Sequence, residues 1–159
     1  MELRPHRGSK RNHQTGRLIM PCELCCTRHL KEIWRNEHFY LIDVSSAEFP
    51  CYLRLISTRH VPEVTDLPEA EQKELWERLT IIEKVIRETL NPDKVNWAQF
   101  GNVVPHMHWH IIARWKDDLF FPDSPWGNAQ KTKTPEKTQE RNKQKEKCLE
   151  LLVEKFKAL

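Results

Sequence analysis

The stretch VPHMHWHIIAR, residues 104–114, decides how this chain of 159 residues is interpreted. Three histidines, His106, His108 and His110, alternate in it with apolar residues. Successive side chains of a β-strand point to opposite faces, so a strand here would place the apolar residues toward a core and the three imidazoles on the other face, open to a cleft or to solvent. One histidine in such a place is most often structural. Three in register indicate a chemical site.

Four segments rich in aromatic and branched residues predict strands at 38–44, 51–57, 94–101 and 106–113. The polar SSAEFP between the first two predicts an antiparallel hairpin. The last two flank a turn at Gly101 and Asn102.

A long helix is predicted between these two pairs of strands. Asp66 is expected to cap its first turn, with Glu69 completing a capping box around Pro68, and Asn91-Pro92 is expected to end it. One apolar stripe repeats at helical spacing through Leu75, Leu79, Ile82, Ile86 and Leu90. A terminal helix is predicted from a second stripe, formed by Leu149, Leu152, Val153 and Phe156.

The order strand, strand, helix, strand, strand favours an α+β fold, in which the helix packs on one face of an antiparallel sheet. Residues 1–19 are basic, lack periodicity and are predicted to be a disordered tail. Residues 20–128 are predicted to form one domain, followed at 129–159 by a charged linker and the C-terminal helix.

Composition limits the class of protein. Hydrophobic residues make up 38% and charged residues 31%, and no apolar run is long enough to cross a bilayer or to act as a secretory signal. The five cysteines are an odd number, and three lie within five positions, which favours a reducing compartment and metal or thiol chemistry over disulfides. These features predict a cytoplasmic protein without membrane contact.

The net charge is +3, and basic residues gather in residues 4–17 and 131–147. Two interpretations of these segments stand: contact with nucleic-acid phosphates, or ordinary solvated segments. The second is favoured because charge runs are usually solvated.

The three histidines have two competing chemical uses. Imidazoles can hold a metal through neutral nitrogens. Alternatively, one imidazole is a nucleophile whose second nitrogen is held by a backbone carbonyl, and a neighbouring histidine handles charge. The spacing alone leaves both uses open.

The segment GNVVPHMHWHIIAR resembles the signature of the histidine triad (HIT) superfamily, in which three histidines alternate with hydrophobic residues and two hydrophobic residues follow. Asn96, the Gly101-Asn102 turn, Arg114 and the PWG of 125–127 extend the likeness to bacterial members. The resemblance covers residues 21–128. It implies the HIT-like fold, an antiparallel sheet of about five strands with one long helix packed on it and a C-terminal helix.

The resemblance also implies an activity: hydrolysis or transfer of nucleotides at the α-phosphate of dinucleoside polyphosphates or nucleoside phosphoramidates. The middle histidine of the family is the nucleophile, which corresponds to His108 and would form a nucleotidyl-histidine. His110 would contact the phosphates as the second catalytic residue. Asn96 would contact ribose or phosphate, and Leu41 would line a nucleobase pocket.

One position departs from the family pattern. Many hydrolytic members carry Ser or Thr in the turn before the triad, where its hydroxyl meets the phosphate or the leaving group, and Val103 stands there in this chain. Asn102 beside it is a partial replacement. This departure leaves open a second function, a nucleotide-binding regulatory protein with little or no turnover.

Cys22 and Cys25 have the spacing of half a zinc site. In several HIT proteins and related uridylyltransferases, such a site is completed by a histidine of an RH segment and by the first histidine of the triad. These correspond to His60 and His106, so the resemblance implies a structural zinc ion on two thiolates and two imidazoles, and no catalytic metal. The alternative is that the cysteines are ordinary thiols and His60 is a surface residue.

A catalytic zinc on all three triad histidines is the weakest hypothesis, because the resemblance assigns His106 to another site. The family also forms two-fold dimers through the helix and a sheet edge. The resemblance therefore implies a homodimer with a nucleotide substrate.

Overall fold

A computed structural model describes residues 22–26, 31–133 and 135–159. The predicted tail at residues 1–19 lies outside this part of the chain. Five strands form one antiparallel sheet, in the order β1-β2-β3-β5-β4. Their bounds are Glu32–Arg35 (β1), Phe39–Asp43 (β2), Tyr52–Ser57 (β3), Lys94–Ala98 (β4) and His108–Arg114 (β5).

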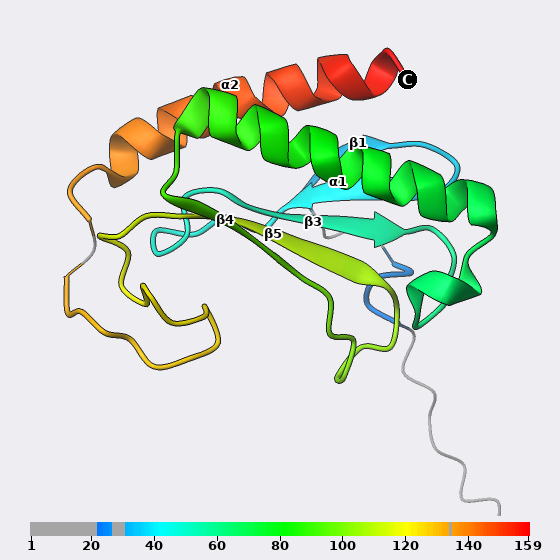
Figure 1. The fold of residues 1–159 in the computed structure, drawn as a ribbon, viewed down its shortest axis with the longest axis horizontal. Coiled ribbons are helices and arrows are strands. Elements are labelled where there is room, and N and C mark those ends of the chain that lie inside the picture. Colours follow the sequence, from blue (N-terminus) through cyan, green and yellow to red (C-terminus); the bar gives the residue numbers. More distant parts are fainter. Residues whose placement is uncertain (1–21, 27–30, 134) are drawn as a thin grey trace, which may run out of the picture.

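Two helices cover the same face of this sheet (Figure 1). They are α1, Glu69–Leu90, and α2, Thr138–Lys157, which pack along each other. All five residues of the predicted stripe on α1 are buried, and they meet inward residues of β2, β3 and β5 in the main core. The α+β prediction, the hairpin of β2 and β3, and the pairing of β4 with β5 are confirmed.

The N-terminal end of α1 differs from the expectation. The helix begins at Glu69 with Pro68 as its N-cap. Asp66 instead belongs to a short 3₁₀-helix, Val64–Asp66, where its carboxylate accepts the backbone N–H of Glu63 at 3.1 Å. The predicted cap was wrong because the proline holds Leu67 in an extended conformation, which separates Asp66 from the helix.

An asparagine forms the C-terminal end of α1. Asn91 ends α1 in the left-handed conformation with φ 45°, which asparagine tolerates better than most residues. The terminal helix starts at Thr138, earlier than the second stripe indicated.

One lysine of the basic stretch 131–147 is not solvated. Lys145 is buried and forms an ion pair with Asp43 of β2 at 3.1 Å, so it packs α2 against the sheet.

Strand β1 was not predicted. It pairs with β2 through an irregular register and is too short and polar to show a strand pattern. The sheet face away from the helices carries a second apolar cluster, formed by Leu24, Tyr40, Ile42 and Ile56. Since Leu24 comes from the segment that holds the cysteines, this cluster packs that segment against the sheet.

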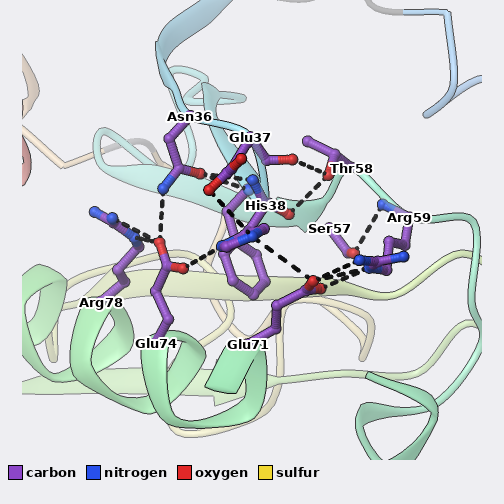
Figure 2. Close-up of polar contacts among 10 residues, drawn as sticks. Asn36, Glu37, His38, Ser57, Thr58, Arg59, Glu71, Glu74 and Arg78 are labelled. Atoms are coloured by element: carbon purple, nitrogen blue, oxygen red, sulfur yellow. Dashed lines mark hydrogen bonds and ion pairs between the residues drawn. The ribbon is translucent and has the colours of Figure 1, made fainter. Parts of the chain in front are cut away.

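A polar network ties the start of α1 to the strand ends (Figure 2). Glu74 accepts hydrogen bonds from Asn36 at 2.7 Å and Arg78 at 2.6 Å, and it pairs with the His38 ring at 2.7 Å. The neighbouring carboxylate, Glu71, is buried and receives Arg59 from the end of β3. Because Glu71 binds Arg59, this network fixes the backbone directly before His60.

Candidate functional site

A cavity of about 450 Å³ opens beside β5 on the sheet face away from the helices. His108 and His110 lie on that face, because the alternate residues Trp109 and Ile111 pack toward the helices. The lining residues are Arg54, Phe100, Gly101, Asn102, Val103, Val104, His108, His110 and Trp126. Two of the three triad histidines therefore share one cavity.

The ring of His108 is fixed in one orientation and one tautomer. Its Nδ1 lies 2.6 Å from the backbone oxygen of His106. A carbonyl oxygen can only accept a hydrogen bond, so Nδ1 carries the proton. In the neutral ring Nε2 is then unprotonated and has a free lone pair. This is the arrangement that a histidine nucleophile needs.

His110 is held by a different partner. A hydrogen bond of 2.5 Å joins its Nδ1 to the hydroxyl of Tyr52, which lies on the neighbouring strand β3. Burial lowers the pKa of His110 to about 3, and the positive charge of Arg54 and the neighbouring His108 ring act in the same direction. His110 is therefore neutral near pH 7 and can donate or accept hydrogen bonds without carrying a charge.

His106 is separated from the other two. It lies in the bend before β5 and is fully buried. Its Nε2 donates to the backbone oxygen of Ser57 at 2.6 Å, so the lone pair of the neutral ring is on Nδ1. Nδ1 faces the sulfur atoms of Cys22 and Cys25, each at 3.5 Å.

These contacts correct the expectation that all three imidazoles are open to a cleft or to solvent. The exposed fractions of His106, His108 and His110 are 0%, 8% and 5%. The segment carrying the cysteines covers the first, and the cavity walls enclose the other two.

Cys22, Cys25, His60 and His106 form a group that can hold one metal ion. Their ligand atoms all lie within 4.8 Å of one another. A zinc ion with tetrahedral angles, about 2.3 Å from sulfur and 2.0 Å from nitrogen, places sulfur and nitrogen ligands about 3.5 Å apart. The distances found are 3.5 Å from each thiol to His106 Nδ1 and 3.3 Å from Cys25 to His60 Nδ1. The carbonyl of Ser57 orients His106 as second partners of metal-bound histidines do.

Three of the predicted substrate-binding residues lie in or beside the cavity. Asn102 and Val103 line the cavity, and the side chain of Val103 is 93% exposed. Asn96 lies on β4 in an adjacent hollow that shares Phe100 and Trp126 with the cavity. Its Oδ1 accepts a hydrogen bond from Arg114 at 2.9 Å.

Leu41 is placed elsewhere. It is fully buried in the core beneath the helices and is not among the residues that line the cavity. The reason is strand alternation: on β2 it is Tyr40 and Ile42 that face away from the helices.

Two cavity residues were not singled out from the sequence. Arg54 stands directly opposite His110 in the register of β3 with β5. Phe100 packs edge to face with Trp126, at 5.0 Å between ring centroids, and Trp126 in turn lies 5.1 Å from the His110 ring. The alternation of CYLRLIS could have indicated that Tyr52 and Arg54 share the face opposite to Leu53 and Leu55.

The model of the HIT domain family matches residues 29–117. A bis(5'-adenosyl)-triphosphatase from Dictyostelium discoideum is 29% identical over 133 residues, which cover 77% of this chain and 89% of that protein.

Two solved structures have a fold similar to that of this chain. A histidine triad protein from Bradyrhizobium japonicum matches with a TM-score of 0.62 and 27% identity, covering 77% of this chain and 89% of its own. A zinc-bound histidine triad family protein from Mycobacterium smegmatis has the same fold, with a TM-score of 0.59 and 20% identity over 87% of this chain and 98% of its own.

The fold and the paired histidines of the cavity define a protein with a histidine triad site. The chain belongs to the HIT family. In the described part of the chain, no helix has the length and hydropathy to span a membrane.

Proposed function

We propose that this protein is a nucleotide hydrolase or nucleotidyl transferase. It acts at the α-phosphate of dinucleoside polyphosphates or nucleoside phosphoramidates, with His108 as the nucleophile. The observation that carries this proposal is the 2.6 Å hydrogen bond from His108 Nδ1 to the backbone oxygen of His106, which leaves Nε2 free at the cavity. The named activity of the Dictyostelium relative supports the first of these two substrate classes, the dinucleoside polyphosphates.

The reaction would have two steps. In the first, Nε2 of His108 attacks the α-phosphorus, the bond to the leaving group breaks, and a nucleotidyl-histidine forms. In the second, water or another acceptor attacks the same phosphorus and the electron pair of the N–P bond returns to Nε2. Dividing one difficult displacement in this way lowers the barrier of each step. His110, held by Tyr52, would fix the phosphate geometry through hydrogen bonds.

The experiment compares the wild-type protein with His108→Ala on diadenosine tri- and tetraphosphates and on adenosine phosphoramidate. Release of adenosine monophosphate is followed by chromatography, and acid-quenched samples are examined by mass spectrometry for an adenylylated protein. We expect turnover and the covalent adduct only with the wild-type protein. Equal turnover by the two proteins would exclude His108 as the nucleophile.

A second function is favoured by one observation. Val103 places an exposed apolar side chain on the cavity, at the position where the resemblance to the family implies Ser or Thr in many hydrolytic members. A nucleotide-binding regulatory protein with little turnover would fit this substitution. Tight binding of adenosine monophosphate without turnover of any of these substrates would favour this second function.

We also propose that Cys22, Cys25, His60 and His106 hold a structural zinc ion. The support is the donor set, two thiols and two imidazoles whose ligand atoms lie within 4.8 Å of one another, the three sulfur–nitrogen distances of 3.3–3.5 Å, and the carbonyl that orients His106. Bound zinc would tether the N-terminal segment to the bend that precedes β5. Because the backbone oxygen of His106 also holds His108, this tether would steady the nucleophile. We propose no catalytic metal on the three triad histidines, a proposal supported by Nδ1 of His106, which faces the cysteines rather than the cavity that His108 and His110 line.

We propose that two copies form a homodimer. β4 lies at the edge of the sheet, and Trp76 on α1 is 46% exposed. The buried indole nitrogen of Trp97 on β4 has no hydrogen-bond partner in the described part of the chain. A second copy that extends the sheet and covers Trp76 would use these features. Sedimentation of the wild-type protein as a monomer at micromolar concentration would contradict this proposal.

A further inference from the structure

Among the described residues that line the cavity, Arg54 alone carries a formal charge. It lies on the same sheet face as His110, its direct partner across β3 and β5. The Nε atom of Arg54 is buried and has no hydrogen-bond partner in the described residues. The residues that line the cavity include no Asp or Glu. A partly buried guanidinium without a counter-charge is unfavourable until an anion approaches it. The cavity is therefore prepared for an anionic ligand next to the nucleophile.

The cavity has little to offer a leaving group that needs a proton. When a P–N bond breaks, the departing amine must take up a proton, whereas a phosphate oxygen can depart as an anion. Val103 has no proton to donate, and the Asn102 amide is not an acid. His110 is buried, and its Nδ1 is engaged by the Tyr52 hydroxyl. Its lowered pKa agrees with a neutral ring.

We propose that Arg54 binds the phosphate of the departing nucleotide and that the site thereby selects polyphosphate substrates over phosphoramidates. The inference rests on the function proposed above and names its leaving group. As Nε2 of His108 forms the N–P bond, the P–O bond to the departing nucleoside phosphate breaks, and its electron pair stays on the departing oxygen. The guanidinium stabilises this developing negative charge, so no proton donor is needed.

Arginine suits this task because its planar fork can make two parallel hydrogen bonds to one phosphate. The edge-to-face pair of Phe100 and Trp126 forms part of the apolar wall of the same cavity. Apolar walls reduce the competition of water for the guanidinium and strengthen its interaction with an anion.

The test compares kcat/KM for diadenosine triphosphate and for adenosine phosphoramidate in four proteins. These are the wild type, Arg54→Leu, Arg54→Lys and the control Arg87→Leu, which removes an exposed arginine of α1 far from the cavity. We expect the wild type to prefer the triphosphate. Arg54→Leu should lose about 10- to 100-fold on the triphosphate, as expected for a charge-assisted hydrogen bond, and much less on the phosphoramidate.

Arg54→Lys keeps the charge and should recover part of the loss, which also guards against misfolding of the leucine variant. Arg87→Leu should match the wild type on both substrates. Equal losses on the two substrates in a folded Arg54→Leu protein, no loss on either, or a wild-type preference for the phosphoramidate would each overturn the proposal.

Binding separates this inference from the proposed function. A methylene-bridged diadenosine triphosphate analogue cannot be hydrolysed, and its affinity is measured by calorimetry with the same proteins. We expect Arg54→Leu to bind it at least about tenfold more weakly. If the wild type turns over neither substrate, the proposed function and the selectivity fail together, while Arg54-dependent binding would still establish the anion subsite. Equal affinity in both proteins would remove that subsite.

Discussion

Replacing Cys25 by Ser tests the proposed zinc site against a control one residue away. The thiol of Cys25 lies 3.3 Å from His60 Nδ1 and 3.5 Å from His106 Nδ1. Cys26 is also exposed but does not belong to the four-residue group. Both substitutions exchange one sulfur for oxygen at the surface and open no cavity. Any difference in stability between the two variants therefore reports the loss of a metal ligand.

The size of the effect follows from mass action. An ion that binds only the folded chain stabilises it by RT ln(1 + [L]/Kd), which is about 2.7 kcal/mol when free zinc is a hundredfold above Kd. For a chain of 159 residues, each kcal/mol shifts Tm by about 2–4 °C. We expect Cys25→Ser to unfold about 5–11 °C below the wild type in zinc buffer. Cys26→Ser should match the wild type.

The assay combines metal content with thermal unfolding, before and after treatment with a strong chelator. Wild type and Cys26→Ser should contain one zinc per chain and lose the same stability on chelation, whereas Cys25→Ser should lack zinc and be insensitive to the chelator. Zinc at one per chain in Cys25→Ser, or a wild type whose Tm does not respond to complete zinc removal, would refute the reasoning.

Three further predictions concern the nucleophile, the core and the polar network. His108→Ala should lose roughly a thousandfold or more in turnover, because the nucleophile itself is removed, with an unchanged circular dichroism spectrum. Leu79→Ala should lower the free energy of unfolding, measured by urea denaturation, by about 2–5 kcal/mol, because the Leu79 side chain is fully buried on the face of α1 that packs against the sheet. The hydrogen bond to Glu74 raises the pKa of His38, and the charges of the neighbouring carboxylates add to it although burial opposes it. Protonated His38 therefore stabilises the fold fully below the ordinary pKa of 6.5, and this contribution should be lost as pH rises through the raised value; Glu74→Gln should weaken that pH dependence.

Each of these predictions has its own control or contrary outcome. Turnover within tenfold of the wild type would rule out His108 as the nucleophile. A change below about 1 kcal/mol for Leu79→Ala would contradict the packing of α1 on the sheet. For the network, Glu77→Gln replaces an exposed carboxylate of the same helix and should keep the wild-type pH profile. The same profile in Glu74→Gln would show that His38 titrates independently of it.

Local patterns in the sequence determined most of the fold. The stripe on α1 appears at helical spacing, and all its members are buried, because a helix on a sheet must bury one face. Two hairpin-like pairs of strand segments predicted the neighbours β2 with β3 and β4 with β5. Strand β1 was not predicted because it is short and half-exposed, and only its pairing with β2 defines it as a strand. The prediction that Asp66 caps α1 was wrong, because Pro68 holds the residue before it in an extended conformation and the helix begins only after the proline.

Some features of the site likewise follow from the local sequence, and others depend on the tertiary structure. Alternation along VPHMHWHIIAR determined that His108 and His110 share a face, since that period is a local property of a strand. Only the tertiary structure decided that Arg54 stands opposite His110, because β3 and β5 are far apart in sequence and their register is set by the whole sheet. It likewise decided that His106 turns toward Cys22 and Cys25. Such contacts join segments many residues apart, and no local spacing encodes them.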